Sequence, residues 1–521
     1  MKRLSFLLLS FLIVISAFAA KIENVGDRLV FAVQMEPMKN VQELHIYLDW
    51  KSVITRMNGL VKEKIVITDL NNDKKIIPSL IDTDQNGIPE GIFFETSFTM
   101  SESLRAFSLG QDNKALNKVS ISTVLPQYDN LIITYLTNAK SYIASHNEPK
   151  AWSEVIAKTI LTTYPDPAKL EIFSQGQWSY TNGYFLNALS ESYFKTKNPE
   201  YLDYIKQWVN LFVKENGKLD SIKYRRKDFE LDNILPGRLL LFLYQHTGDK
   251  RYAIMAAQLI DQLNNQPKTS EGGFWHKKVY TQQMWLDGIY MGDVYLAQYA
   301  SVFNQPQYFD EAAKQMELIY KHTLDTKTGL LYHGWDESKN KIWANSQTGA
   351  SPEFWGRALG WYIMALVDGL DYFPANHPER KALLQIFKDL SASLAKYQDT
   401  ATGMWYQVVN KGQLPGNWVE SSCTAMFAYA FAKGFQKGYL GPEYLAKASG
   451  AFKGLIAKEV YFDDQDKIYL TGTVKVGTLN LKVSKGDYDY YINVDRRIND
   501  FKGIAALMYL ALTLEDLKGV K

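Results

Sequence analysis

Two kinds of helical segment alternate along most of this chain, and the alternation restricts the folds open to it. Residues 357–373 are apolar almost all the way round, apart from Asp368 and Asp371, so they predict a largely buried helix. Residues 201–214 predict an amphipathic helix, because apolar side chains share one face: Leu202, Ile205, Trp208, Val209 and Phe212. Such alternation favours two concentric layers of helices.

The starts of these helices recur along the chain. Apolar or small-residue segments begin near Tyr180, Asp232, Asp287, Arg357, Ser421 and Asp500. More amphipathic segments begin near Tyr201, Arg251, Tyr308, Pro378 and Gly441, and residues 129–145 and 150–163 can complete the outer layer. A repeat of roughly 50 to 80 residues predicts a mainly α fold over residues 126–521, a closed (α/α)6 barrel of inner and outer helices. An open helical solenoid is the alternative.

Residues 21–125 have a different pattern, which predicts β structure. Short runs rich in β-branched and aromatic residues span 29–34, 44–48, 63–68, 75–80 and 91–98, with Asn- and Gly-containing turns between several of them. We therefore expect a small β-sandwich-like N-terminal domain ahead of the barrel.

Residues 1–20 predict a secretion signal. Lys2 and Arg3 precede an apolar run over residues 4–17, and Ala17-Phe18-Ala19 has the small residues of a cleavage site. The apolar run is short for a membrane anchor, and no cysteine near it would carry a lipid. We expect a periplasmic or secreted protein without a membrane anchor.

The composition restricts the partners and the cross-links that this chain can have. Lys and Arg number 58 against 56 Asp and Glu, which argues against nucleic acid as the main partner. Cys423 is the only cysteine, so no intrachain disulfide forms. The 33 Tyr and 12 Trp fit either sugar stacking or the filling of a large helical core.

The barrel topology predicts where the functional residues gather. If inner and outer helices alternate, all inner helices run in the same direction, and their N-termini meet at one end of the barrel. Polar and aromatic motifs lie at these starts: Trp178-Ser179-Tyr180, Leu231-Asp232-Asn233, Trp285-Leu286-Asp287, Trp355-Gly356-Arg357 and Glu420-Ser421-Ser422. We expect them to line one cleft, where free backbone N–H groups favour an anion.

Asp287 and Asp232 are the best acid/base candidates. Trp285, Tyr290 and Met291 surround Asp287 in the sequence, and dry surroundings raise the pKa of a carboxyl group, as an acid near neutral pH requires. Paired carboxylates in different environments divide acid and base duties. The alternative for each is a helix N-cap, which would lower its pKa.

Other polar residues at the expected active face are candidates for binding a ligand. His276 and Lys277 lie in a Gly-rich loop, and His333 lies in a second loop before an inner helix. Arg357 can bind a carboxylate through two nitrogens, between Trp355 and Trp361 as sugar platforms, or it can pair with an Asp between helices. The barrel motifs have no metal-ligand spacing, and we expect no cofactor.

The segment Asp82-Thr83-Asp84-Gln85-Asn86-Gly87 resembles the first half of a calcium loop, with oxygen ligands at alternate positions followed by Gly. The full EF-hand pattern fails, because Phe93 occupies its last position. A polar hairpin turn is the other interpretation, and a bound ion would have a structural role.

Together the barrel motifs resemble those of the unsaturated rhamnogalacturonyl hydrolases, glycoside hydrolase family 105, which is close to the unsaturated glucuronyl hydrolases of family 88. The resemblance covers roughly residues 130–521. Besides the helix starts, it rests on His276-Lys277, Tyr332-His333-Gly334-Trp335, Trp361 and Ser422-Cys423-Thr424-Ala425, where family members often have Gly in place of Cys423.

The resemblance implies hydration of the 4,5-unsaturated uronic acid that polysaccharide lyases leave at the non-reducing end of their products, and it needs no metal. Asp287 would protonate C4 and then take a proton from the water that attacks C5, with Asp232 orienting the water or ring hydroxyls. Arg357 and His333 would hold the carboxylate, and His276 and Lys277 would contact the substrate or support the acid. The sugar would be walled by Tyr180, Trp285, Trp355 and Trp361.

Three alternatives remain open from the residues. A conventional glycosidase would use Asp287 and Asp232 as acid and base on a saturated glycoside. A lyase on this fold would need a Tyr or His base that faces a uronate. A secreted glycan-binding protein would use the aromatic residues without cleavage. Pectin-type substrates with rhamnose after the uronate are the family's default.

Overall fold

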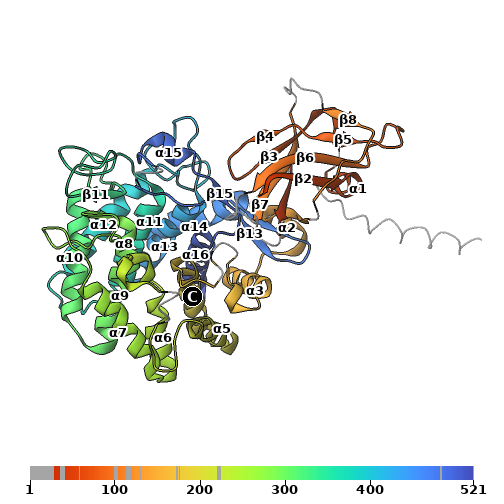
Figure 1. Ribbon diagram of the computed structural model, residues 1–521. Helices are drawn as coiled ribbons and strands as arrows, with labels where there is room; N and C mark the ends of the chain where they lie inside the picture. The colour runs from red at the N-terminus through yellow and green to blue at the C-terminus, as the bar shows by residue number, and fades with distance from the viewer. Residues whose placement is uncertain are drawn as a thin grey trace, which may run out of the picture.

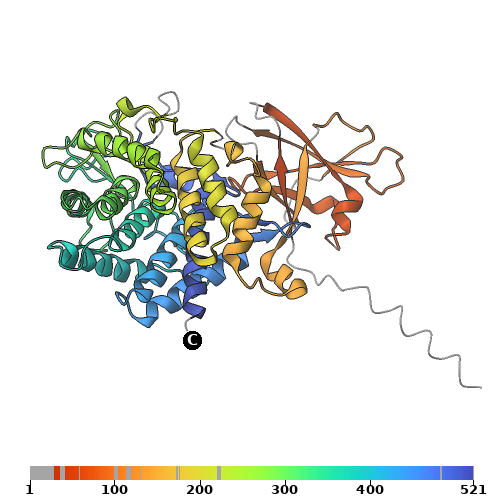
Figure 2. The same cartoon turned by 90° about the horizontal axis from the view of Figure 1, so that it is seen from below.

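A computed structural model describes residues 28–35, 41–57, 59–98, 104–112, 119–129, 131–171, 174, 176–219, 224–480 and 484–519. The predicted secretion signal lies outside these residues. A β-rich part and a helical part lie side by side (Figures 1 and 2). No helix in the described ranges is both long and apolar enough to cross a membrane.

The β-rich part contains two stacked sheets. Its strands are β1 (Arg28–Gln34), β2 (Val41–Asp49), β3 (Ile65–Asp69), β4 (Lys75–Ile76), β5 (Ser79–Ile81), β6 (Gly91–Phe98), β7 (Leu104–Gln111), β8 (Ser120–Ser122) and β9 (Ile132–Asn138), with the short helices α1 (Trp50–Ile54) and η1 (Lys62–Lys64). One sheet has the order β2-β6-β5-β8. Phe94 of this sheet packs edge-on against Phe107 of the other sheet. Phe107 in turn stacks on Phe31, which belongs to the same sheet as Phe107. Apolar rings between the sheets therefore form the core.

The second sheet crosses the predicted domain boundary. Its order is β13-β12-β9-β1-β7-β3-β4, and β12 (Val460–Phe462) and β13 (Ile468–Leu470) come from the helical half of the sequence. The prediction that residues 129–145 form an outer helix is wrong, because they contain β9 and only the short helix α2 (Ala139–His146). The run Ile132-Ile133-Thr134-Tyr135 explains the difference, since β-branched and aromatic residues favour a strand.

The helical part alternates buried and amphipathic helices, as predicted. The buried helices are α4 (Tyr180–Thr196), α6 (Gly237–Thr247), the run α8 (Leu286–Gly288), η5 (Ile289–Asp293) and α9 (Val294–Phe303), α11 (Gly356–Gly369), α13 (Ser421–Gln436) and α16 (Phe501–Gly519). The outer helices are α3 (Trp152–Thr163), α5 (Pro199–Asn210), α7 (Lys250–Asn264), α10 (Gln307–Thr323), α12 (Arg380–Lys396) and α14 (Pro442–Lys458). Every residue of α11 is buried, which confirms the prediction for that segment.

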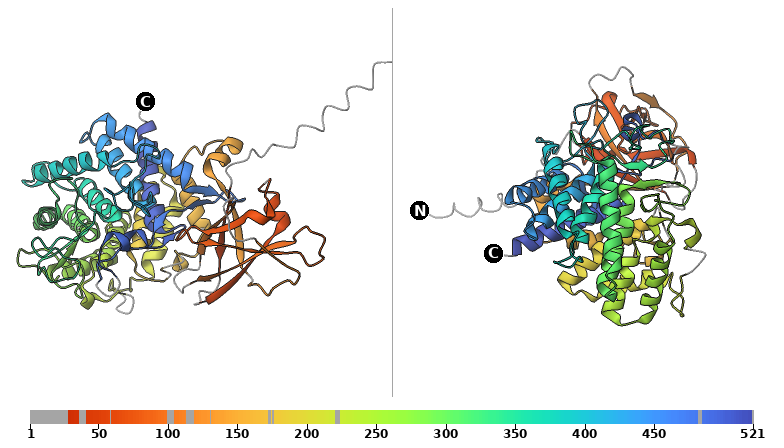
Figure 3. Two further views of the ribbon diagram at one scale, coloured as in Figure 1. Left: turned by 90° about the horizontal axis from the view of Figure 1, so that it is seen from above. Right: turned by 90° about the vertical axis from the view of Figure 1, so that its left-hand side faces the viewer.

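The buried helices close into a ring. Helix α4 packs against α6 and α16, α9 lies between α6 and α11, and α13 lies between α11 and α16. A closed ring agrees with a barrel and not with an open solenoid. The left view of Figure 3 shows the barrel helices beside the β-rich part from above, and the right view looks onto the helical part.

Short elements occupy the loops. They are η2 (Pro167–Lys169), η3 (Arg226–Asp228), η4 (Leu231–Asn233), α15 (Tyr488–Ile492), β10 (Gln283–Trp285), β11 (Gly334–Asp336), β14 (Thr473–Val474) and β15 (Arg496–Arg497). The pairs β10–β11 and β14–β15 form two small sheets. These loop elements position the residues of the candidate site.

Candidate active site

Asp287 lies in the first turn of α8, where strand β10 runs directly into the helix. Trp285 is the N-cap residue and makes no side-chain capping bond, so the capping alternative does not describe Asp287. The helix then continues as a π-helical turn, η5, a feature that is frequent at functional sites. Gly288 allows close packing, because a Cβ at this position would lie only 3.0 Å from Nδ1 of His276.

Pairing of β10 with β11 brings His333 to Asp287. Trp285 pairs with Gly334, and the N–H of Leu286 donates to the carbonyl oxygen of His333 at 3.0 Å. Nε2 of His333 lies 3.2 Å from Oδ2 of Asp287. Both atoms are buried, yet neither makes an aligned hydrogen bond to the described residues. A bound ligand can therefore complete the polar contacts of this pair.

The other ring nitrogen of His333 is held by Tyr491, a residue of α15. Nδ1 of His333 and the Tyr491 hydroxyl oxygen are 2.6 Å apart, and both side chains are fully buried. Burial, and then the charge of nearby groups including Asp287, raises the pKa of Tyr491 well above its usual value, so the hydroxyl keeps its proton. Tyr491 was not among the predicted site residues, although the run Tyr488-Asp489-Tyr490-Tyr491 before an inner helix was a visible signal.

Asp232 has a different environment from Asp287. Its Oδ2 lies 2.8 Å from Nζ of Lys277, and its Oδ1 lies 3.5 Å from Nε2 of His276. Burial alone would raise the pKa of Asp232, but the charge of Lys277, together with His276 and with hydrogen bonds from Lys277 and Glu230, lowers that pKa overall. Asp232 lies in η4, ahead of α6, and it does not cap the helix. The side chain is therefore a carboxylate at neutral pH.

The groups around Asp232 divide into one cation, one neutral ring and a second acid. Burial lowers the pKa of His276 to about 4, so the imidazole is neutral at neutral pH. Burial works against the charge of Lys277, but Asp232 and Glu230 raise its pKa, and the lysine stays protonated. Glu230 also contacts Lys277. Sequence reasoning missed Glu230, which lies two residues before Asp232.

Aromatic side chains connect the two carboxylate environments. Trp285 stacks on His276 with ring centroids 4.7 Å apart, and on Tyr280 at 4.6 Å. The rings of Trp285 and His333 are in edge-to-face contact with their centroids 5.4 Å apart. The His333 ring centroid lies 4.7 Å from that of Trp355. Trp285 and Trp355 are almost wholly buried, whereas Tyr280 is partly exposed. Tyr280 was also missed, and it offers an accessible ring to a sugar.

Tyr180 and Trp361 extend this aromatic wall into the barrel. Tyr180 opens α4 and is partly exposed, and its ring centroid lies 6.5 Å from that of Trp361. Burial, followed by the charge of Asp232, raises the pKa of Tyr180. Trp361 is 1% exposed and packs on Tyr184 and Tyr290, so it supports Tyr180 from the barrel interior.

Arg357 is buried against a loop instead of offering an open fork. Its Nη1 donates to the carbonyl oxygen of Val474 at 2.5 Å, and its Nη2 donates to that of Lys475 at 3.2 Å. The guanidinium also lies over the Trp355 ring, with its carbon 5.1 Å from the centroid. Both terminal nitrogens have carbonyl partners, so a two-nitrogen grip on a carboxylate stays a prediction. In this conformation Arg357 supplies buried positive charge beneath Trp355.

Contacts thus join nearly all the sequence-predicted site residues into one network. It runs from Lys277, Asp232 and His276 through Trp285 to His333 and Asp287, and on through Trp355 to Arg357. Tyr180 contacts Trp361, and its pKa responds to the charges of Asp232, Arg357 and Asp287. One partly exposed acid beside a histidine, one lysine-paired carboxylate and several rings suit acid–base chemistry on a sugar.

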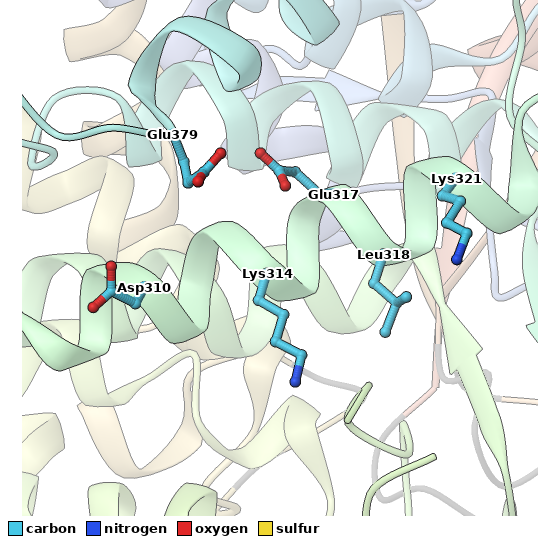
Figure 4. Close-up of a pocket in the computed structure, with 6 residues that line it drawn as sticks. All are labelled: Asp310, Lys314, Glu317, Leu318, Lys321 and Glu379. Carbon is cyan, nitrogen blue, oxygen red and sulfur yellow. The ribbon is translucent and has the colours of Figure 1, made fainter. Parts of the chain in front are cut away.

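A hollow of about 470 Å³ lies elsewhere, on the outside of the barrel. It is lined by Asp310, Lys314, Glu317, Leu318, Lys321 and Glu379 (Figure 4). None of the predicted site residues lines it. Among the described residues, Asp82, Asp84 and Glu90 are the one acidic or histidine group close enough to share a metal ion, and they lie in the β-rich part.

Comparison with known proteins identifies a family and several relatives that the chain resembles. The sequence profile of Glycosyl Hydrolase Family 88 matches residues 152–518. The unsaturated rhamnogalacturonyl hydrolase YesR of Bacillus subtilis is 26% identical over 348 residues, 66% of this chain and 91% of YesR. A solved structure of a family 105 glycoside hydrolase from C. acetobutylicum ATCC 824 is 35% identical, covers 70% of this chain and 99% of its own, and has a TM-score of 0.67.

A more distant structure shares the fold alone. The unsaturated glucuronyl hydrolase of Bacillus sp. GL1 is 14% identical, with a TM-score of 0.52 over 71% of this chain and 96% of its own. The helical part of the chain is therefore similar to solved proteins over nearly their whole length.

Proposed function

Because the family profile matches most of its length, the chain belongs to glycosyl hydrolase family 88 and is a glycoside hydrolase, and we propose that it removes a 4,5-unsaturated uronic acid from the non-reducing end of lyase-generated oligosaccharides. Pectin or rhamnogalacturonan fragments are the favoured substrates, in line with the similarity to YesR and to a family 105 enzyme. The observation that carries the proposal is the contrast between Asp287, which faces His333, and Asp232, which is paired with Lys277.

In the proposed reaction, Asp287 donates a proton to C4 of the vinyl ether. The C4=C5 electron pair forms the new C–H bond, and positive charge develops at C5 and the ring oxygen. Water attacks C5 and returns its proton to Asp287, which restores the acid. The resulting hemiketal collapses, opens the ring and releases the next sugar.

The two carboxylates have separate duties in this scheme. Lys277 keeps Asp232 ionised, so Asp232 is unsuited to donate a proton and suited to orient water or ring hydroxyls. Its negative charge, and that of Asp287 after proton transfer, stabilises the cationic transition state. Both side chains are largely shielded from water, with 14% exposure for Asp232 and 15% for Asp287, which strengthens these interactions.

Substrate contacts follow from the same network. His333 and Lys277, with the buried charge of Arg357, favour the uronate carboxylate, and His276 supports both Asp232 and Trp285. The partly exposed Tyr180 and Tyr280 wall the sugar, with Trp285, Trp355 and Trp361 behind them. We also propose export to the periplasm or the medium, on the signal-like pattern of residues 1–20.

The test is the ultraviolet absorbance of the conjugated uronate in lyase-generated oligosaccharides. We expect the wild-type chain to remove this signal from pectin-type fragments, and Asp287→Asn to lower kcat by about 10²- to 10⁴-fold or more, because the proton donor is lost. Asp228→Asn is the matched control and should keep full turnover, because this partly exposed carboxylate lies four residues before Asp232 and pairs with Arg225.

Each contrary outcome has a distinct meaning. A flat trace with sugar release from saturated oligosaccharides would identify a conventional glycosidase. A flat trace without any release would favour a glycan-binding role. Unchanged turnover in a folded Asp287→Asn chain, checked by circular dichroism, would remove Asp287 from the mechanism.

A further inference from the structure

The hairpin loop between β5 and β6 places oxygen-bearing side chains at alternate positions. Asp82, Asp84, Asn86 and Glu90 occupy the first, third, fifth and ninth positions of the loop, and Gly87 occupies the sixth with a φ of +85°. Glycine suits that left-handed backbone, and the same spacing in calcium loops turns successive oxygens toward one point. One carboxylate oxygen from each of Asp82, Asp84 and Glu90 lies within 4.8 Å of the others.

Asp82 provides a second and independent observation. The residue is 6% exposed, and its Oδ2 accepts a hydrogen bond from the N–H of Gly87 at 3.0 Å. Its Oδ1 is buried and has no hydrogen-bond partner among the described residues. A buried carboxylate oxygen without a partner is costly, so this atom indicates a missing positive ligand. It belongs to the same carboxylate that converges with Asp84 and Glu90.

Lys62, on η1, contacts the loop from outside its sequence and does not fill that role. Nζ of Lys62 donates to the carbonyl oxygen of Gly87 at 2.6 Å. The lysine thus bonds to the carbonyl of the sixth loop position, Gly87. In calcium loops the backbone ligand is the carbonyl of the seventh position, which is Ile88 here.

We propose that this loop binds one calcium ion, with Asp82, Asp84, Asn86 and Glu90 as side-chain ligands and Ile88 as the backbone ligand. Phe93 at the twelfth position has no oxygen to bind the ion, and Glu90 at the ninth position supplies a carboxylate ligand instead. A site with only oxygen ligands suits Ca²⁺, whereas Mg²⁺ requires near-ideal octahedral geometry and keeps several waters. The ion ties β5 to β6 and stabilises the β-rich part. The inference is independent of the barrel's activity.

The experiment uses the purified chain after treatment with a chelator, with terbium as a luminescent probe and calcium as the competitor. The hydroxyl of Tyr47 donates to the backbone carbonyl of Glu90 at 3.0 Å, so an aromatic sensitiser lies beside the loop. We expect one saturable terbium site that calcium displaces with an affinity of about 10⁻⁴ to 10⁻³ M, the range of extracellular modules. Millimolar calcium should also raise the melting temperature.

Three variants make the test specific. Asp84→Asn changes an exposed ligand and should weaken calcium binding about tenfold or more, since affinity depends on ligand charge. Asp82→Asn should weaken it at least as much. Asp464→Asn is the matched control in the acidic hairpin Asp463-Asp464-Gln465-Asp466, where Asp464 pairs with Arg56, and it should bind calcium like the wild type.

Several results would overturn the proposal. They are the absence of saturable terbium luminescence, an Asp84→Asn chain that binds calcium like the wild type, or stabilisation by magnesium and not by calcium. If Asp82→Asn fails to fold, the exposed Asp84→Asn variant still decides the outcome. Turnover of unsaturated oligosaccharides should be the same in Asp84→Asn as in the wild type, which separates this test from that of the hydrolase.

Discussion

Tyr491 holds the ring of His333 through one nitrogen while the other nitrogen faces Asp287. The distances are 2.6 Å and 3.2 Å, and the histidine is wholly buried. The hydroxyl selects the tautomer of the imidazole, and the tautomer decides whether Nε2 offers a proton or a lone pair to Asp287. Tyr491 is thus a positioning residue for the proposed acid.

Replacement of Tyr491 by Phe should reduce kcat by about 10- to 100-fold with a small change in KM, because the orienting hydrogen bond is lost while the ring is kept. The pH profile of kcat should shift as well, because His333 loses the hydrogen bond that fixes which of its ring nitrogens carries the proton. Tyr488→Phe in the same short helix is the control, because its hydroxyl bonds to the carbonyls of Leu414 and Pro415. An unshifted profile with normal kcat would give Tyr491 a packing role only.

At the residue scale, sequence patterns predicted the polar members of the site better than their partners. Asp232, His276, Lys277, Asp287 and His333 lie together in the structure. The pairing of Lys277 with Asp232 was not visible, because it depends on how two loops fold over one another. The carbonyl partners of Arg357 come from residues 474 and 475, more than a hundred positions later, and no local pattern predicts such a contact.

Helix α10 contains a carboxylate with an unusual environment. Glu317 points toward Glu379, which lies just before α12 (Figure 4). Burial, and then the negative charge of Glu379, raises the pKa of Glu317 to about 7. The folded chain therefore holds this proton more tightly than the unfolded chain does. Stability from this group is present at low pH and is lost as pH rises from about 4.5 to 7.

Glu317→Gln should remove that pH dependence, because the amide stays neutral. We expect the variant to melt at a higher temperature than the wild type at pH 8 and at a similar temperature near pH 4.5, as measured by thermal unfolding across this range. Glu443→Gln, at an exposed position on α14, is the control. Parallel melting curves for wild type and Glu317→Gln across the range would contradict the prediction.

At the element scale, the period of the apolar pattern predicted the barrel helices well and the strands less well. The long segments at α4, α11 and α13 have strong patterns, and the structure has helices there. The single strand predicted over residues 75–80 is divided into β4 and β5, because Pro78 lacks the N–H that a ladder needs. Strands β7 and β9 were missed, since a short apolar run does not distinguish a strand from a helix.

The whole molecule is joined by a sheet that both halves build. Tyr461 of β12 pairs with Asn138 of β9, and β9 pairs with β1. Arg56 of the β-rich part also pairs with Asp464 of the β12–β13 hairpin at 3.1 Å. No sequence pattern predicts pairing between segments so far apart, so a boundary after residue 125 was the natural expectation.

A chain that begins at residue 126 should therefore fold poorly. Removal of the N-terminal strands leaves β9 without β1 and exposes apolar side chains at an unprotected edge. We expect a lower yield of soluble protein, association on size exclusion and a lower melting temperature than in a chain that begins at residue 21. A truncated barrel that is monomeric, equally stable and fully active would show that the shared sheet is dispensable.

The shared sheet also has a consequence for synthesis. Strand β9 is made long before β12, and at about 5 to 20 residues per second the ribosome needs roughly 15 to 60 seconds for the chain between them. During that interval the outer edge of β9 has no strand to cover it, and a neighbouring nascent copy could pair there instead. The strand that covers this edge is therefore synthesised late, and correct folding of the N-terminal half depends on how soon β12 pairs with β9.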